Sequence, residues 1–404
     1  MKITIVTGFF LPVPAVRGGS TEKIWHRLAQ QFAAAGHEVT IVSRRWPGFA
    51  NRETVAGVHH VRVRGANHSR SLLVNLAHDF FWGLRVARVL PPADIVVCNT
   101  PILPAWLGRI RQTSGRVVAV VARMPKGHAQ AYGRVDLLLA LSDAVGAALR
   151  AANPGLADRV VPFPYPIDWN LHAQAGAKAV APTPLTIGYI GRIHPEKGLR
   201  LLLEAASLLT RRSDLPPWRL ELIGPSSIPQ GGGGEVFRDG LIADFAPVLG
   251  PRLELRGPEF DPAALARRYG GIDVFCYPSL AEKGETFGVA IAEAMAAGAA
   301  PVVSALGCFR ELVHDGRTGL VFEHSAPDAA ERLAAVLTRL LSNESERRTM
   351  GERAQAHVRR YDFAEVSRQV LEHFSELVRR SPPSVARVLP TAPADASDIV
   401  KPDA

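Results

Sequence analysis

The chain has 404 residues, of which 47% are hydrophobic and 21% are charged. This length excludes a single ordinary core, and the composition is typical of a soluble globular protein, so we expect two domains of similar size. The 47 basic and 38 acidic side chains give a net charge of +9, which favours anionic partners in general. No apolar run has the length of a membrane span and no signal-peptide pattern opens the chain, so a cytoplasmic location is predicted.

The cysteines and the spacing of possible metal ligands argue against two classes of protein, namely disulfide-rich and metal-binding proteins. Cys98, Cys276 and Cys308 are widely spaced and odd in number, which predicts buried free thiols in a reducing compartment. No spacing typical of metal ligands is present, so no metal site is predicted. The sequence contains no basic-aromatic repeat or known nucleic-acid module, which ranks nucleic acid last among the anionic partners.

The first predicted turn of interest contains a glycine pair. An apolar strand over residues 2–7 is followed by Gly18 and Gly19 and then by an amphipathic helix over residues 21–35. Because glycine has no Cβ, the backbone of such a pair can approach a phosphate closely. The glycine spacing does not match the dinucleotide fingerprint. A flexible turn is the alternative interpretation.

Residues 71–90 predict an amphipathic helix, in which a Phe80-Phe81-Trp82 run adjoins Arg85 and Arg88. A helix of this kind can lie on a membrane surface. An apolar stripe more often packs into a core. The sequence leaves both interpretations open, so a peripheral contact at the inner membrane face is one of two alternatives.

The second half of the chain again alternates strands and helices. Residues 173–184 are rich in Ala, Pro and Gly, which predicts an interdomain linker. A strand over residues 185–190 precedes Arg192 and Lys197, and a helix over 199–209 follows. Two cations at a strand end can stabilise the charge on a departing diphosphate, as a divalent metal does elsewhere. A solvated basic loop is the alternative for these two residues.

A second strand end carries two carboxylates. After a strand that ends at Tyr277, Glu285 and Glu293 are separated by seven residues across the start of an alanine-rich helix. Backbone N–H groups near Phe287 and Gly288 can point at an anion, and carboxylates accept hydrogen bonds from vicinal hydroxyls of a sugar or ribose. Together these groups predict a nucleotide-sugar site. The alternative is an ordinary exposed helix with two solvated glutamates.

These residues carry a family resemblance. The string ETFGVAIAEAMA over residues 285–296, with Gly298 and PVVS over 301–304, is similar to the signature of the family-4 retaining glycosyltransferases of GT-B fold. The segment GRIHPEKG over 191–198 resembles the phosphate-contacting segment of that family. The resemblance covers most of the chain and is more specific in the second half. It implies an α/β architecture of two Rossmann-like domains that face each other across a cleft.

The resemblance also implies how the chain is divided. It predicts an acceptor-binding domain over residues 1–172, a linker over 173–184 and a nucleotide-sugar-binding domain over 185–360. A helix over 361–380 is expected to pack back on the first domain, and residues 381–404, rich in Pro, Ala and Asp, are expected to be disordered. Gly307, Arg310 and Glu311 are expected to begin a further helix.

Site roles follow from the resemblance as well. Arg192 and Lys197 would stabilise the leaving diphosphate, Glu285 would hold hydroxyls of the donor sugar, and Glu293 would hold the ribose. Gly18 and Gly19, with Phe287 and Gly288, would face the donor phosphates. The donor would be a nucleoside-diphosphate sugar, with no further cofactor and no metal, and the acceptor a glycan, lipid-linked sugar or small molecule. A GT-B sugar-nucleotide epimerase and a non-catalytic nucleotide-sugar-binding protein are the alternatives.

One position departs from the pattern of the family. The segment RMPKGH over residues 123–128 occupies the place where the family often has a histidine beside the transferred sugar, and no histidine lies directly at that strand end. Arg123 and Lys126 could instead meet an anionic group, or His128 could be displaced by a few residues. The catalytic residue of the first domain is therefore left open among these three.

Overall fold

The computed structural model describes most of the chain, namely residues 1–16, 19–69, 71–110, 115–125, 127–176, 184–282 and 284–380; of residues 108–110 and 128 only the backbone is described. Several predictions therefore lie outside the described residues. They concern Gly18, Lys126, the tail over 381–404 and most of the linker over 173–184. Cys98, Cys276 and Cys308 are described, and all three are buried free thiols, as predicted.

The described residues of the first domain form an eight-stranded sheet in the order β3-β4-β2-β1-β5-β6-β7-β8. Every pair is parallel except the edge pair of β3 and β4, which is antiparallel. The strands are β1 (Lys2–Val6), β2 (Glu38–Arg44), β3 (Arg52–Val55), β4 (Val58–Val63), β5 (Ile95–Cys98), β6 (Arg116–Val121), β7 (Leu137–Ala140) and β8 (Val160–Pro162). The helices are α1 (Ser20–Ala34), α2 (Leu72–Val89), α3 (Leu103–Ile110) and α4 (Asp143–Ala152).

Helices cover both faces of this sheet, because successive strand residues point to opposite sides. Ile5 of β1 packs in one apolar cluster with Trp25 of α1. The next residue, Val6, packs in a second cluster with Trp82 of α2. The alternation buries β1 on both faces, which is typical of parallel sheets between helical layers.

The second domain contains a six-stranded parallel sheet in the order β11-β10-β9-β12-β13-β14. Its strands are β9 (Leu185–Ile190), β10 (Trp218–Ile223), β11 (Leu253–Arg256), β12 (Val274–Tyr277), β13 (Ala300–Ser304) and β14 (Leu320–Phe322). Its helices are α6 (Leu199–Leu209), α7 (Glu235–Leu249), α8 (Pro262–Gly270), α9 (Val289–Ala296), α10 (Ala329–Ser342) and α11 (Glu344–Val358). The strand order reverses between β9 and β12, and open α/β sheets bind ligands at the carboxyl ends of strands at such a point.

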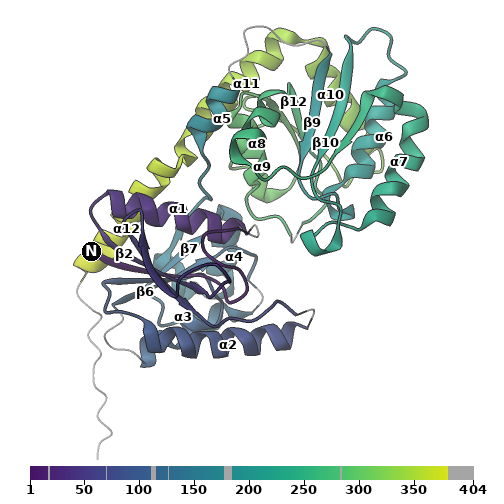
Figure 1. Ribbon diagram of the computed structural model, residues 1–404. Helices are drawn as coiled ribbons and strands as arrows, with labels where there is room; N and C mark the ends of the chain where they lie inside the picture. The colour runs from purple at the N-terminus through teal and green to yellow at the C-terminus, as the bar shows by residue number, and fades with distance from the viewer. Residues whose placement is uncertain are drawn as a thin grey trace, which may run out of the picture.

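The chain crosses between the domains twice, at adjacent places. The Ile167 N–H donates to the Tyr361 carbonyl at 2.8 Å, and the Phe363 N–H donates to the Ile167 carbonyl at 3.1 Å. After the first crossing, α5 (Trp169–Ala175) packs against α8 and α9 of the second domain. After the second crossing, α12 (Phe363–Arg379) returns to the first domain and lies along α1, as Figure 1 shows.

Candidate active site

The turn after β9 is built so that Lys197 cannot move freely. The short 3-10 turn Pro195–Lys197 begins with a proline, and the His194 imidazole accepts from the Glu196 N–H at 3.3 Å. Gly198 closes the turn with a φ of 67°. A Cβ at Gly198 would lie 2.0 Å from the Pro278 carbonyl oxygen, so the close contact with the β12 loop requires glycine.

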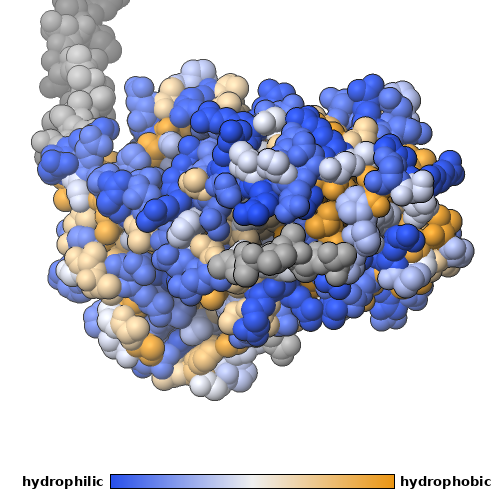
Figure 2. Space-filling view, turned by 90° about the horizontal axis from the view of Figure 1, so that it is seen from above, coloured by the Kyte–Doolittle hydropathy of each residue, from blue (hydrophilic) through white to orange (hydrophobic). Residues whose placement is uncertain are grey.

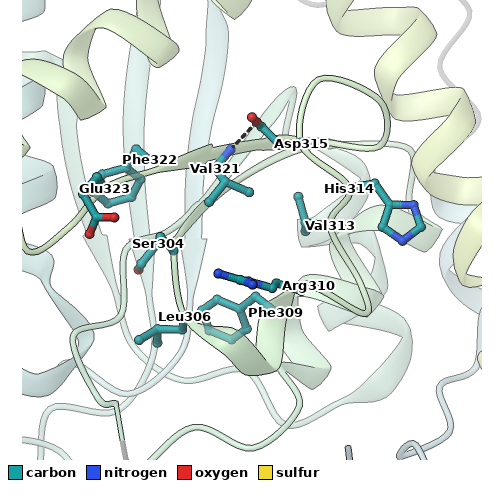
Figure 3. A pocket seen from close by; sticks show the side chains of 11 residues that line it. Ser304, Leu306, Phe309, Arg310, Val313, His314, Asp315, Val321, Phe322 and Glu323 are labelled. Carbon is teal, nitrogen blue, oxygen red and sulfur yellow. Dashed lines mark hydrogen bonds between the residues drawn. The ribbon is translucent and has the colours of Figure 1, made fainter. Parts of the chain in front are cut away.

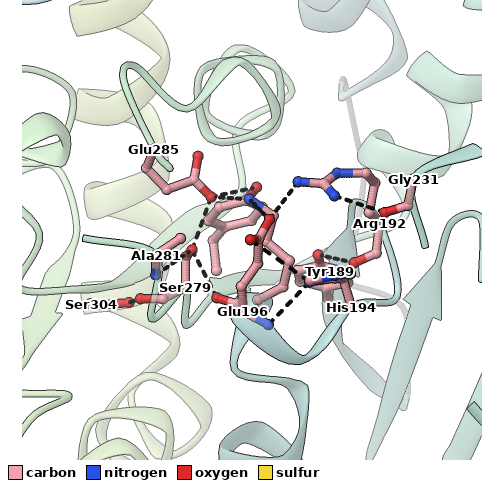
Figure 4. Close-up of polar contacts among 11 residues, drawn as sticks. Tyr189, Arg192, His194, Glu196, Gly231, Ser279, Ala281, Glu285 and Ser304 are labelled. Atoms are coloured by element: carbon pink, nitrogen blue, oxygen red, sulfur yellow. Dashed lines mark hydrogen bonds and ion pairs between the residues drawn. The ribbon is translucent and has the colours of Figure 1, made fainter. Parts of the chain in front are cut away.

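Arg192 lies near Glu196 and Glu285 beyond the carboxyl end of β9 (Figure 4), and Lys197 contacts Glu285 at the same place. Lys197 is buried, with 5% of its surface exposed, and its Nζ contacts Glu285 Oε1 in a short ion pair. The Arg192 guanidinium donates to the Gly231 carbonyl at 2.7 Å and to Glu196 Oε1 at 2.5 Å. Both cations are thus held in place without a ligand, which reduces the entropy that binding must overcome.

The two carboxylate oxygens of Glu285 differ in their hydrogen bonds to the described residues. Its Oε1 accepts from Lys197 Nζ, from Ser279 Oγ at 2.9 Å and from the Tyr277 hydroxyl at 3.3 Å. Within the described part of the chain, no hydrogen bond to Glu285 Oε2 is formed. The three donors fix the carboxylate, and Oε2 is therefore able to accept a hydrogen bond from a ligand hydroxyl.

Helix α9 begins beside this cluster. Gly288 precedes its first residue with a φ of 95°, and a Cβ there would lie 2.8 Å from Ile291 Cδ1 and 3.2 Å from Phe309 Cε1. Phe287 is buried and its ring packs edge-on against Tyr361 at 5.3 Å between centroids. The anchored Phe287 and the glycine turn fix the helix start, whose first N–H groups have no partner within the helix.

Glu293 lies further along α9 and has different neighbours. Its Oε2 accepts from the Tyr269 hydroxyl at 3.0 Å, and its Oε1 is 3.8 Å from His172 Nε2. Among the described residues, no hydrogen bond or ion pair joins Glu293 to Lys197 or Glu285. The two carboxylates are connected instead by a row of packed rings, Tyr269, Phe275 and Tyr277, whose neighbouring centroids are 5.8 and 6.2 Å apart.

Comparison with known proteins decides the family. The model described as Glycosyltransferase Family 4 matches residues 18–170, and the model described as Glycosyl transferases group 1 matches residues 173–357. The chain belongs to the family-4 glycosyltransferases. The matches fall on the two structural domains, so both halves of this glycosyltransferase are typical of the family.

A mycobacterial relative shares about a third of its residues with this chain over the matched part. The phosphatidyl-myo-inositol mannosyltransferase of Mycobacterium tuberculosis (strain ATCC 25618 / H37Rv) is 31% identical over 247 residues, which are 60% of this chain and 59% of that protein. The match therefore spans less than two thirds of the relative's length.

Solved structures establish the fold. Sucrose-phosphate synthase from Thermosynechococcus elongatus superimposes with a TM-score of 0.74 at 22% identity, over 93% of this chain and 99% of that chain. Anabaena Alr3699/HepE, solved in complex with UDP and glucose, gives a TM-score of 0.68 at 19% identity, over 93% of this chain and 100% of that chain. The predicted GT-B architecture of two Rossmann-like domains is confirmed.

The first domain contributes fewer of the predicted site residues. Gly19 precedes α1 with a φ of 100°, and a Cβ there would lie 2.4 Å from Glu22 Oε2, so only glycine fits. Burial raises the pKa of the Tyr165 phenol, and the charge of the nearby Arg123 lowers it in part. His128 begins a 3-10 turn, but its side chain is outside the described part.

Sequence reasoning did not single out Glu22, although the structure buries it. Only 3% of Glu22 is exposed, and burial raises the pKa of its carboxyl above the ordinary value. The neighbouring Thr21 and Tyr165 hydroxyls are 3.1 Å apart. A signal was present, because Glu22 precedes Trp25 and Ala29 at the helical spacing that places all three on the buried face of α1.

The prediction for Glu311 was wrong. This residue was expected near the start of a helix, but only a 3-10 turn, Gly307–Phe309, forms there. Glu311 instead reaches across the domain boundary, and its Oε1 accepts from the Asp143 N–H at the start of α4 at 2.6 Å. Burial raises the pKa of the Glu311 carboxyl to about 7, with a further increase from the Asp143 charge. The contact joins the two domains through a carboxyl that titrates near neutrality.

This contact makes stability depend on pH. Because the folded-state pKa of Glu311 is about 7 and the ordinary value is 4.5, the folded protein holds an extra proton between these values and loses stability as the pH rises through 7. Glu311→Gln keeps an acceptor for the Asp143 N–H without the charge. We expect the Tm of the variant to exceed that of the wild type increasingly from about pH 5 to pH 8. Parallel Tm curves would contradict the assignment, and Glu372→Gln, on the exposed side of α12, is the control.

Three cavities surround these residues. One of about 890 Å³ lies between the domains beside Glu311, and Gly307 and residues of α4 and α12 line it. One of about 370 Å³ lies at the carboxyl ends of β10 and β11, and Arg238 and Arg256 line it. The third, of about 480 Å³, is shown in Figure 3; Ser304 and Arg310 lie in its wall. Ser304 connects this cavity to the cluster, because its hydroxyl donates to the Ser279 carbonyl at 2.6 Å.

Proposed function

We propose that this glycosyltransferase moves a sugar, with retention of anomeric configuration, from a nucleoside-diphosphate sugar to a hydroxyl of an acceptor. The observation that supports this most directly is the meeting of Arg192, Lys197 and Glu285 at the carboxyl ends of β9 and β12. Fixed cations beside a helix start suit a diphosphate, and a carboxylate with one free oxygen suits a sugar hydroxyl.

The proposed reaction uses these groups in separate roles. Arg192, Lys197 and the N–H groups at the start of α9 stabilise the negative charge that grows on the departing diphosphate. Glu285 Oε2 accepts from a hydroxyl of the donor sugar. The acceptor hydroxyl attacks on the same face from which the diphosphate leaves, and the departing phosphate oxygen takes its proton. Closure of the two domains excludes water and limits hydrolysis of the donor.

The nucleoside part of the donor has its own proposed place. The cavity of about 370 Å³ at the ends of β10 and β11 takes the base, and Glu293 accepts from the ribose hydroxyls. UDP is the nucleotide bound in Alr3699/HepE, so it is the first nucleotide to test. No cofactor other than the donor is proposed.

We propose a lipid acceptor reached from a membrane surface. Helix α2 has one side chain that packs in the core and several apolar side chains that are available to a membrane. Trp82 is fully buried, whereas the exposed fractions are 70% for Leu72, 78% for Leu73, 44% for Phe80 and 54% for Phe81. These apolar side chains share the helix with Arg85 and Arg88, a combination that suits an anionic bilayer. The face seen in Figure 2, turned away from α2, carries mainly hydrophilic side chains. The name of the mycobacterial mannosyltransferase also refers to a lipid.

Within the described chain, no helix is both long and apolar enough to cross a bilayer. Binding to vesicles is therefore the property to measure. Phe80→Ser combined with Phe81→Ser removes apolar area from the exposed face of α2, and we expect cosedimentation with phosphatidylglycerol vesicles to fall at least about tenfold. Phe260→Ser, at an exposed phenylalanine of the second domain, is the matched control. Equal loss in both proteins would contradict a specific role of α2.

The proposed activity can be tested directly. Thermal-shift screening against UDP-, GDP-, ADP- and dTDP-sugars should reveal one stabilising donor. With that donor, release of the nucleoside diphosphate should depend on an acceptor such as phosphatidylinositol in vesicles, and NMR of the product should show the anomeric configuration of the donor. Stabilisation by a donor without turnover on any acceptor would favour a binding protein, and an inverted product would contradict retention.

Metal dependence provides a separate prediction. Because two fixed cations take the place that a divalent ion occupies in other enzymes, activity should persist in excess EDTA at close to its initial rate. The measurement is the initial rate before and after dialysis against EDTA, with and without added Mg²⁺. Complete loss that Mg²⁺ restores would contradict the proposed role of the cations.

A further inference from the structure

His172 belongs to the connection between the domains and lies beside Glu293 of the second domain. It lies on α5, a few residues after the first crossing, and 3% of it is exposed. Its ring packs edge-on against Tyr269 at 5.3 Å between centroids. Its Nε2 is 3.8 Å from Glu293 Oε1, whereas its Nδ1 has no hydrogen-bond partner in the described chain.

The surroundings of His172 favour the neutral imidazole. Burial is the largest cause that lowers its pKa, and the Lys23 charge on α1 lowers it further, against the opposing charges of Glu293 and Asp168. Tyr269, whose own pKa burial raises well above its ordinary value, faces the ring as a neutral phenol. A neutral imidazole carries one N–H, and the carboxylate beside Nε2 favours the tautomer that has the proton there.

An N–H group and a carboxylate oxygen 3.8 Å apart are too distant to bond to each other directly. They suit a hydroxyl placed between them, because a hydroxyl can accept from one group and donate to the other. Tyr269 donates to the other oxygen of the carboxylate, Glu293 Oε2, and Oε1 accepts no hydrogen bond from the described residues, so it suits this role. The pair therefore matches the chemistry of a ribose hydroxyl.

We infer that His172 and Glu293 together form the ribose subsite, in which His172 donates to a ribose hydroxyl that Glu293 accepts from. This inference rests on the proposed nucleotide-sugar function and adds a residue that the signature of the second domain does not contain. It places part of the donor site on the interdomain connection.

The start of α5 is also joined to the first domain. Asp168 caps α5 through the Leu171 N–H and forms an ion pair with Arg27 of α1 at 2.6 Å. This ion pair joins α1 of the first domain to the start of α5, which packs on the second domain.

The test compares nucleotides with and without ribose hydroxyls. His172→Phe keeps an aromatic ring against Tyr269 and removes the N–H. We expect it to weaken UDP binding, measured by calorimetry at neutral pH, by roughly threefold to tenfold, and to leave the affinity for 2′,3′-dideoxy-UDP unchanged. The same pair of ligands with Glu293→Gln gives a second, independent variant, and the Tm of each variant reports folding.

Acid pH adds a readout that packing alone would not change. Protonated His172 would attract the Glu293 carboxylate, which would then no longer accept from the ribose. As the pH is lowered, the UDP affinity of the wild type should therefore fall more steeply than that of His172→Phe. Titration of the diphosphate itself is common to both proteins and cancels in the comparison.

The outcomes are distinguishable. If the variants lose affinity for UDP alone, the inference is supported. If they lose affinity for UDP and for dideoxy-UDP equally, the inference is overturned and the proposed function is left intact. Failure of the wild type to bind any of UDP, GDP, ADP and dTDP overturns both the inference and the proposed function.

Discussion

Lys197→Met is expected to lower turnover roughly 10²- to 10³-fold, because it removes a fixed cation from the position where the leaving diphosphate becomes charged. The buried Lys197 Nζ lies between Glu285 and Glu196, within 5.7 Å of the Tyr277 ring centroid. Its stem fills space that methionine also fills. The effect should therefore appear in kcat at saturating donor, measured as nucleoside diphosphate released in the presence of acceptor.

A matched control separates this role from general charge effects. Arg200 is a cation on the first turn of α6 that pairs with Asp244 at 2.7 Å and is about half exposed. Arg200→Met should retain nearly full activity. Lys197→Met leaves the Glu285 carboxylate without its cation, which can lower stability. The Tm of the variant is therefore measured together with its turnover to show that it is folded. A folded Lys197→Met protein with wild-type turnover would remove the proposed leaving-group role.

Glu285→Gln is the second large effect we expect. Gln retains an oxygen for Ser279 and Tyr277 but has lost the negative charge that strengthens a hydrogen bond from a sugar hydroxyl. We expect kcat/KM for the donor to fall roughly 10- to 100-fold. The inhibition constant of the free nucleoside diphosphate should change little, because that product lacks the sugar.

Glu282→Gln serves as the control for this variant, since Glu282 lies three residues earlier on the same loop with 72% of its side chain exposed. It should behave as wild type. If Glu285→Gln weakened the free nucleotide as strongly as the sugar donor, the carboxylate would be acting on the diphosphate site through Lys197, and the assignment to the sugar would be wrong.

The elements around the donor site were predictable because they depend on local patterns. The apolar run of β9 and the amphipathic helix α6 occur where the sequence places them, at residues 185–190 and 199–209. Arg192, Lys197 and Glu285 lie in the loops after the buried strands β9 and β12, so the rule that ligands bind at strand ends was enough to bring them together. Their catalytic roles stay predictions until the variants are measured.

What the sequence did not predict depends on contacts between distant segments. The edge strand β3 reads Arg-Glu-Thr-Val, which is too polar and too short to predict a strand, and it forms because β4 offers an open edge. The contact between Glu311 and α4 requires the relative placement of two domains, about which no local pattern carries information.

The paired crossings at Ile167 and Tyr361–Phe363 have a consequence for how the enzyme can move. Two separate tethers would let the halves slide past each other, but these two crossings are hydrogen-bonded side by side and form one connection. We expect this connection to restrain relative translation of the domains and to leave rotation about it open. Opening and closing of the enzyme is therefore expected to be a rotation about an axis through the paired crossings.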